Sequence, residues 1–295
     1  MNQDFVLALA LPLTLFLMMF SMGTTLRASD FRTLLRHPSA VWIGLCSQLL
    51  LLPALAILIL SQLQVPVELF VGFMILALSP GGTTSNLFSY LADGNVALSI
   101  ALTAIVSLIA PFSLPIAANW LLADELADVA LTLPVLPTVL RLLVVTLLPL
   151  LLGMLLRRYR EAFCRKKETV LTRVPFVMLL GVIGGIVEEN WANMPVFLEQ
   201  TLLPALLLAT VALLAAYVGA RTLGRDARDA RTIAIETSIQ NGGTAMLVTG
   251  TILQNPAMTV APIMYGILML LPMFCFLGVR RASKAGGSGE AGIAT

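Results

Sequence analysis

Glu236 is the residue of this chain whose position most directly suggests chemistry. The chain carries 16 Asp and Glu residues, and Glu236 is the one that lies well within a long apolar segment. An ionised carboxylate at mid-membrane costs roughly 2.5–3.5 kcal/mol, so this group needs a neutralising partner or a proton. We predict a carboxylate whose charge is balanced by a bound cation. The alternative is a protonated, hydrogen-bonded glutamic acid that only ties helices together.

Two polar breaks interrupt apolar segments in opposite halves of the chain. Residues 79–86 read Ser-Pro-Gly-Gly-Thr-Thr-Ser-Asn, and residues 238–244 read Ser-Ile-Gln-Asn-Gly-Gly-Thr, so both contain Gly-Gly-Thr. Proline and paired glycines in mid-membrane free backbone groups from the helical ladder. Such groups are tolerated only where they line a cavity or are buried in protein. Matched breaks in two halves of a membrane protein indicate a transporter binding site.

Oxygen-bearing side chains accompany Glu236 and the two breaks. They are the hydroxyls of Ser85 and Ser99 and the amides of Asn86 and Gln240. A set of oxygen ligands suits a hard cation rather than zinc or copper.

Three further polar residues are ambiguous from spacing alone. Ser99 and Thr103 share one face of a helix, and each hydroxyl could instead bond the carbonyl of its own helix. Gln48 stands in the middle of an apolar segment, where an interhelical hydrogen bond is the simpler explanation.

The composition indicates which elements must position these residues. Hydrophobic residues make up 58% of the 295 and charged residues 12%, about half of the roughly 25% usual in soluble domains. This excludes an ordinary soluble enzyme and a disordered chain, and a net charge of +2 argues against nucleic-acid binding. With three scattered cysteines and the single histidine His37, catalysis through zinc or a histidine triad is also disfavoured. We predict an all-α polytopic membrane protein.

Nine transmembrane helices are predicted, and residues 1–284 form one transmembrane unit. The spans are 4–24, 39–61, 67–91, 94–122, 133–156, 170–187, 197–220, 229–253 and 257–279. The amphipathic stretch 28–37 is predicted to lie along the membrane surface, and the tail 285–295 to be disordered.

The basic residues predict the orientation of these spans. Every Lys and Arg except Arg141 follows the first, fifth, seventh or ninth span, whereas acidic residues populate the opposite loops. Basic loops face the cytoplasm, so in the plasma (inner) membrane the N-terminus is outside and the C-terminus is cytoplasmic. The two broken spans then run in opposite directions, as in inverted repeats of roughly 39–122 and 197–279. Arg141 is either an anchor, which reaches the outer interface or packs against a neighbouring helix, or a residue that draws anions into an outer vestibule.

The chain resembles the bile acid:sodium symporter family, in its nine-span bacterial form, along almost its whole length. The resemblance rests on residues 20–31, on 79–86 with 93–99, and on 235–242. It implies a core and a panel domain, two broken helices that cross, and two Na+ sites. The implied ligands are Ser85, Asn86, Ser99, Thr103 and Glu236 for the first ion, and Gln48, Glu236, Gln240 and the carbonyls of Thr237 and Ile239 for the second.

The same resemblance places substrate beside the crossing. Thr83 and Asn241, with Gly82 and Gly242 next to them, are the implied substrate residues. Some family members carry polar residues in the middle of the last helix, whereas residues 265–272 are essentially apolar here. This difference favours a small organic acid over bile acid itself.

We therefore expect a sodium-coupled secondary active symporter that imports an organic anion, bile acid-like or a small carboxylate, by alternating access. The alternatives on the same fold are proton coupling through Glu236 and sodium-independent transport. An intramembrane enzyme or a receptor is disfavoured, because the sequence offers no nucleophile with a base and a receptor needs no inverted breaks. The expected partners are the lipid bilayer and the substrate, without nucleic acid or a required protein partner.

Overall fold

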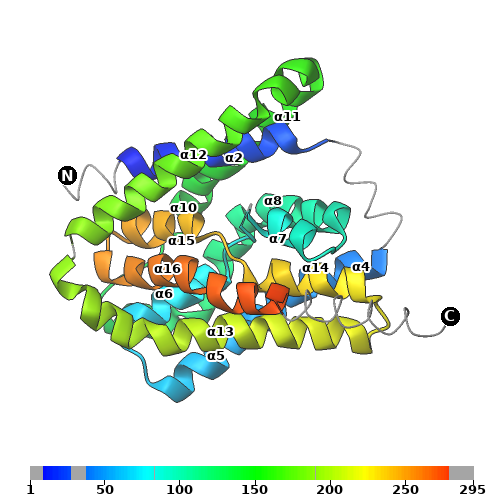
Figure 1. Cartoon of the computed structure of the whole chain (residues 1–295). Helices are drawn as coiled ribbons and strands as arrows, with labels where there is room; N and C mark the ends of the chain where they lie inside the picture. The colour runs from blue at the N-terminus through cyan, green and yellow to red at the C-terminus, as the bar shows by residue number, and fades with distance from the viewer. Residues whose placement is uncertain (1–8, 28–37, 83, 190, 279–295) are drawn as a thin grey trace.

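A computed structural model describes residues 9–27, 38–82, 84–189 and 191–278 of the chain, and these residues are almost entirely helical (Figure 1). The elements are α2 (Leu11–Thr25), α4 (Pro38–Cys46), η3 (Ser47–Leu51), α5 (Leu52–Leu63), α6 (Val67–Ala77), α7 (Thr84–Leu91), α8 (Val96–Leu121), α9 (Ala123–Asp128), α10 (Val135–Leu142), η4 (Leu143–Leu147), α11 (Leu148–Tyr159), α12 (Glu161–Glu189), η5 (Trp191–Asn193), α13 (Met194–Thr222), α14 (Ala227–Ser238), α15 (Gly242–Met246), η6 (Leu247–Ile252) and α16 (Pro256–Leu268).

Six helices of the described chain are long and apolar enough to cross a membrane. They are Pro38–Leu63, Val96–Leu121, Val135–Tyr159, Glu161–Glu188, Trp191–Thr222 and Pro256–Gly278. Each overlaps one predicted span, which confirms a multi-pass membrane protein. The helix that contains the sixth span begins well before residue 170, because the basic segment after Tyr159 continues as helix beyond the apolar part.

The other three predicted spans correspond to shorter helices. Helix α2 is the described part of the first span, while α6 with α7 and α14 with α15 are the two interrupted spans. The count of nine spans stays a prediction. The predictions for 28–37 and 285–295 fall outside the described residues.

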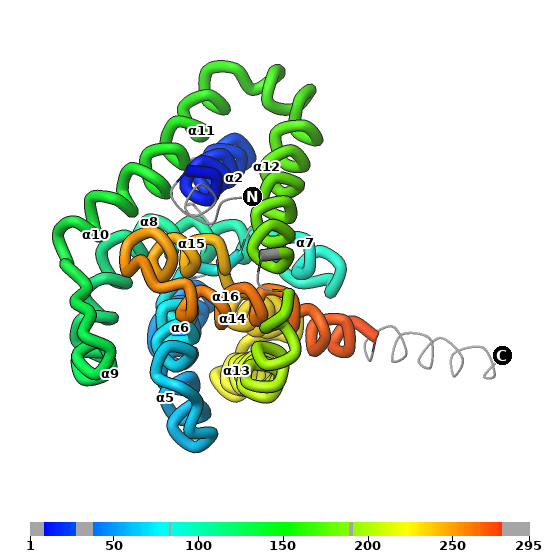
Figure 2. Tube along the Cα trace, turned by 90° about the vertical axis from the view of Figure 1, so that its left-hand side faces the viewer, coloured from blue at the N-terminus to red at the C-terminus, as the bar shows by residue number. Residues whose placement is uncertain are grey.

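Three helices gather on one side of the molecule, where α2 lies between α11 and α12 (Figure 2). Helices α2 and α11 approach closely because both have glycine at the contact. A Cβ at Gly23 would lie 2.1 Å from the carbonyl oxygen of Leu150, and one at Gly153 would lie 2.2 Å from that of Phe20. Small residues are what allow membrane helices to bring their backbones together.

Two of the long helices contain a π-helical turn just before a proline. Segment η3 precedes Pro53, and η4 precedes Pro149. A proline has no N–H to give to the preceding turn, and a local π turn adjusts the ladder around the carbonyl that loses its partner. Gln48 lies in the first of these turns.

Candidate ion-binding site

The two breaks cross and bond to each other through their main chains. The backbone N–H of Gly82 donates to the carbonyl of Ile239 at 3.0 Å, and that of Asn241 donates to the carbonyl of Pro80 at 2.9 Å. These bonds form an isolated antiparallel bridge between Gly81 and Gln240. Backbone groups that leave the helical ladder thus find partners inside the protein, as the low-polarity surroundings require.

The carboxylate of Glu236 lies fully buried at this crossing and accepts hydrogen bonds on both oxygens. Oε1 accepts from the hydroxyl of Ser85 at 2.6 Å and from that of Ser99. Oε2 accepts from the hydroxyl of Thr103 at 2.8 Å and from Nε2 of Gln48 at 3.2 Å. The donors come from α7, α8 and η3, so four elements meet at one carboxylate. Four of the predicted ion ligands therefore lie together around Glu236, namely Ser85, Ser99, Thr103 and Gln48.

The three hydroxyls form a compact cluster of oxygen atoms. Besides its contact with Glu236, the Thr103 hydroxyl lies 3.0 Å from the carbonyl oxygen of Ser99 and 3.4 Å from the Ser85 hydroxyl. The helix back-bond considered from sequence is therefore present at Thr103, together with the contact to the carboxylate. A hydroxyl that donates its proton keeps two lone pairs, so these oxygens suit a hard cation as ligands.

Asn86 adds an amide oxygen beside this cluster in sequence. Its Oδ1 is buried and has no hydrogen-bond partner among the described residues. Burying a carbonyl oxygen without a hydrogen-bond donor costs free energy, and coordination of a cation offsets that cost. This unpaired oxygen fits a cation ligand.

A second group of oxygens lies around the carbonyls at the end of α14. Nε2 of Gln48 donates to the carbonyl of Glu236 at 2.9 Å, and Nε2 of Gln240 donates to that of Thr237 at 2.9 Å. Oε1 of each glutamine is buried without a partner within the described part of the chain. The carbonyl of Ile239 accepts from Gly82 and keeps one lone pair. Gln48 thus makes the interhelical bond considered from sequence and also has an oxygen left for an ion.

The predicted substrate residues are distributed differently. Asn241 caps helix α15, since its Oδ1 accepts from the N–H of Thr244 at 3.1 Å. Gly82 and Gly242 lie against main chain: a Cβ would come within 3.1 Å of the carbonyl oxygen of Gln240 or of Pro262, respectively. Thr83 lies outside the described residues. The substrate role of all four stays a prediction.

Residues 12–218 match the model of the Sodium Bile acid symporter family. The chain belongs to this family. The family assignment confirms the resemblance seen in the sequence and the prediction of a transporter rather than an enzyme. The match ends before α14, so the family model does not cover Glu236.

Several relatives of this symporter-family chain are transporters by name. It is 33% identical over 238 residues to an uncharacterized sodium-dependent transporter of Bacillus subtilis, covering 78% of this chain and 71% of that protein. It is 30% identical to a probable chloroplastic sodium/metabolite cotransporter of Arabidopsis thaliana, covering 81% of this chain and 58% of that protein. It is 25% identical to the rabbit (Oryctolagus cuniculus) ileal sodium/bile acid cotransporter, covering 93% and 79%.

The site of this symporter-family chain also includes a tyrosine that the sequence reasoning missed. Tyr265 is fully buried, and its hydroxyl donates to the carbonyl of Ser238, the last residue of α14, at 2.9 Å. It packs edge-on against Phe73, with ring centroids 6.5 Å apart. A tyrosine within an otherwise apolar span was the available signal, because a buried phenol needs a partner for its O–H.

A polar link at one end of the crossing was also missed. Nδ2 of Asn95 donates to Asp229 at 2.8 Å, and the N–H of Asn95 donates to the hydroxyl of Thr232 at 2.7 Å. These bonds join the start of α8 to the start of α14. They therefore help to fix the position of Ser99 relative to Glu236. Each residue looks like an ordinary helix-end residue in the sequence, so no local signal revealed the pairing.

Arg141 is exposed and reaches segment η6 of the second broken span. Its Nη1 lies 3.4 Å from the carbonyl oxygen of Thr251 in η6. This contact agrees with the packing role considered from sequence. The role in attracting anions is untested.

Proposed function

We propose that this protein is a sodium-coupled secondary active symporter that imports an organic anion across the plasma membrane by alternating access. The observation that carries the proposal is the Glu236 carboxylate, buried where two broken helices cross and surrounded by Ser85, Ser99, Thr103 and Gln48. A buried carboxylate among neutral oxygens suits a hard monovalent cation, because the carboxylate supplies negative charge and the neutral oxygens supply the remaining ligands. The names of the relatives favour sodium as that cation.

Two sodium ions would bind as substrates of the transport cycle. The first would use Ser85, Asn86, Ser99, Thr103 and Glu236, and the second would use Gln48, Glu236, Gln240 and the carbonyls of Thr237 and Ile239. The buried unpaired oxygens of Asn86, Gln48 and Gln240 support this division. Glu236 contributes to both groups, so loss of its charge would impair both ions.

The anion would bind beside the crossing. Helix α7 begins at Thr84, and the helix formed by α15 and η6 begins at Gly242, both directly after a break. The partial positive charge at such helix starts favours a carboxylate or sulfonate. Thr83 and Asn241 would orient it, with Gly82 and Gly242 allowing close approach of the backbone.

The fold suggests which parts move. The order of a long helix, a broken helix and a second long helix occurs over α4–α8 and again over α13–α16. We assign these as inverted repeats that form a core, and α2, α11 and α12 as part of a panel (Figure 2). Rocking of the core against the panel would expose the crossing to each side in turn.

Proton coupling through Glu236 is the second candidate, because the same four donors surround the same carboxyl group. The two candidates predict opposite responses of purified protein in liposomes. Sodium coupling requires that uptake of a radiolabelled organic acid be driven by an inward Na+ gradient but not by K+ with an inward pH gradient. Glu236→Gln keeps the size of the side chain and removes its charge, so it should abolish Na+-driven uptake and Na+-dependent thermal stabilisation of a folded protein.

A contrary result would identify the proton candidate. If the pH gradient drives uptake in wild type, and Glu236→Gln leaves uptake independent of pH while Na+ has no effect on either protein, Glu236 is a proton site. Failure of every organic acid to be taken up under either gradient would contradict both candidates.

A further inference from the structure

A second site lies where α2, α11 and α12 meet, away from the crossing. Here Leu26, Arg27 and residues of α11 and the start of α12 line a cavity of about 620 Å³. The close contact of Gly23 with Gly153 lies next to this cavity, and α2 ends at Thr25, so the two helices no longer touch through small residues beyond that point.

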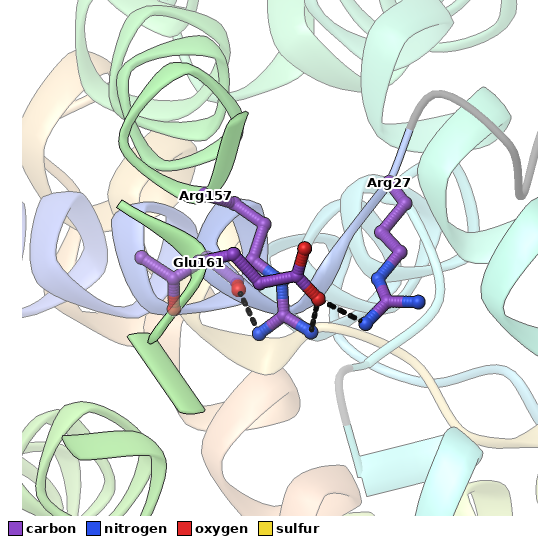
Figure 3. Close-up of polar contacts among 4 residues, drawn as sticks. Arg27, Arg157 and Glu161 are labelled. Carbon is purple, nitrogen blue, oxygen red and sulfur yellow. Dashed lines mark hydrogen bonds and ion pairs between the residues drawn. The ribbon is translucent and has the colours of Figure 1, made fainter. Parts of the chain in front are cut away.

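The charges around this cavity are predominantly positive. Arg27, Arg157 and Arg158 line it together with one acid, Glu161. Figure 3 shows Arg27 and Arg157 approaching the same oxygen of Glu161, at 2.5 and 3.9 Å. The carboxylate is thus engaged by two arginines, and the group as a whole has an excess of two positive charges.

Two of these guanidinium groups have unmet capacity. Arg158 is exposed, makes no ion pair in the described part of the chain, and lies over the ring of Tyr159 at 6.0 Å. Nη1 of Arg157 donates to the carbonyl of Thr24, while its Nε is buried and has no partner among the described residues. Arg158 is the accessible one of the two, and its fork of N–H donors suits an anion with several oxygens, such as a phosphate.

Apolar side chains form a stripe along α11 that leads to the arginines, as an acyl chain leads to the phosphate of a lipid. Leu151, Met154, Leu155 and Arg158 follow the spacing i, i+3, i+4 and i+7, so they form one stripe along α11. Leu151 and Leu155 are 47% and 49% exposed, and they precede Arg157 and Arg158 along a helix that is long and apolar enough to span a membrane. The exposed ring of Tyr159 follows at the end of this helix, and aromatic residues are enriched where membrane helices meet lipid headgroups.

We propose that this cavity, which we call the α2–α11 groove, binds one anionic phospholipid of the cytoplasmic leaflet. The phosphate lies against Arg158 and Arg157, and an acyl chain follows the stripe of Leu155 and Leu151. The excess positive charge repels the cation of a choline headgroup, since Glu161 is already engaged by two arginines. The lipid would bridge α2 and α11 beyond the close contact of Gly23 with Gly153. This proposal does not depend on which ion the protein transports.

The test measures lipid selectivity of the full-length protein. Native mass spectrometry of protein in mixed micelles with equal phosphatidylglycerol and phosphatidylcholine should show phosphatidylglycerol retained. Arg158→Gln should lower this retention about fivefold, the change that corresponds to about 1 kcal/mol per basic residue at the surface. Arg173→Gln, an exposed arginine of α12 outside the groove, is the matched control and should retain the lipid as wild type does.

A second variant tests the apolar stripe without changing charge. Leu155→Trp fills the groove at an exposed position and should also reduce retention of phosphatidylglycerol. Unchanged thermal transitions of both variants in phosphatidylcholine alone would establish that they fold. Equal retention of the two lipids by wild type, or equal losses in Arg158→Gln and Arg173→Gln, would overturn the proposal. Displacement of the lipid by millimolar inorganic phosphate would also overturn it, because it would mean that the groove recognises a soluble anion.

Discussion

Gly81 on one broken helix lies directly against the carboxylate of Glu236 on the other. A Cβ at position 81 would come 3.0 Å from Oε2 of Glu236 and 3.4 Å from Nε2 of Gln48, while the backbone at 81 already pairs with Gln240. The absence of a side chain at Gly81 is therefore what allows the two helices to cross at the carboxylate of Glu236.

Gly81→Ala should damage sodium coupling. The added methyl group would push apart the two crossing segments or displace the side chains of Glu236 and Gln48. Overpacking of this kind destabilises a protein by about 1–3 kcal/mol. We expect the Na+ concentration for half-maximal uptake to rise about tenfold. Gly181→Ala is the control, because a Cβ there meets nothing within 4 Å. Equal Na+ dependence of the two variants would contradict this role of Gly81.

The hydroxyl of Thr103 should contribute to ion binding separately from its contribution to folding. Thr103→Val keeps the shape but removes the oxygen, and a hydrogen bond to a charged group contributes about 1.5–3 kcal/mol. We expect the Na+ affinity, measured from the Na+ dependence of the thermal transition, to fall at least tenfold, with Thr103→Ser close to wild type. Thr138 is also fully buried and back-bonds its own helix, so Thr138→Val controls for the loss of a buried hydroxyl. A similar loss of Na+ response in both valine variants would assign Thr103 a structural role.

Asn241 should be separable into a helix cap and a substrate ligand. Asn241→Ala removes the acceptor for the N–H of Thr244 and should lower stability by about 0.5–2 kcal/mol. Serine caps helices about as well as asparagine, so Asn241→Ser should restore the thermal transition. If Asn241 also orients substrate, Asn241→Ser still binds substrate weakly while Na+ stabilises the empty protein. Full recovery of substrate affinity by serine would leave only the capping role.

The substrate should require a negative charge. Two helix starts next to the crossing, at Thr84 and Gly242, favour an anion. The neutral amide of a transported carboxylate should therefore compete at least tenfold more weakly, since this charge–dipole interaction and its hydrogen bonds are together worth about 1.5–3 kcal/mol. A sulfonate of similar size should still compete. An organic cation that is transported well and competes with carboxylates would contradict the proposed site.

The orientation of the chain can be tested with single cysteines. In a protein lacking Cys46, Cys164 and Cys275, a cysteine at Arg165 should react with an impermeant thiol reagent only from the cytoplasmic side. A cysteine at Asp124, in the acidic segment α9, should react only from outside. Labelling of both positions from one side would remove the basis for the inverted repeats.

The sequence predicts the two helix breaks and the buried carboxylate of Glu236 well, because prolines, paired glycines and charged residues are all unfavourable within a membrane helix. Pro80 and the glycines beside it disrupt a helix wherever they stand, and Glu236 is costly in lipid whatever surrounds it. Such local violations need no knowledge of the tertiary structure. The sequence alone places the hydroxyls of Ser85 and Ser99 among the oxygen ligands near Glu236. The contacts of Thr103 and Gln48 with Glu236 were expected only through the family resemblance, since a hydroxyl or amide within one helix can equally bond its own helix or a neighbouring one.

The partners of the freed backbone groups were not predictable from the sequence. That Pro80 bonds to Asn241 and Gly82 to Ile239 depends on the packing of distant segments, and neither residue type encodes its partner. The ion pair between Arg27 and Glu161 is a similar case, because positive-inside counting assigns both to one side of the membrane without pairing them. The π turn at Gln48 depends on a proline five residues later and on packing around it.

The crossing has a consequence for how the protein is made. Its two backbone hydrogen bonds join the first half of the chain to the second, and at about 5–20 residues per second the ribosome needs roughly 10–30 s between them. During that interval the first break must stay in a wet or chaperoned environment, because lipid offers its N–H and C=O groups no partner. A chain interrupted before α14 would therefore stay exposed to membrane proteases. Two half-chains made separately should each be unstable, yet accumulate when they are produced in the same cell.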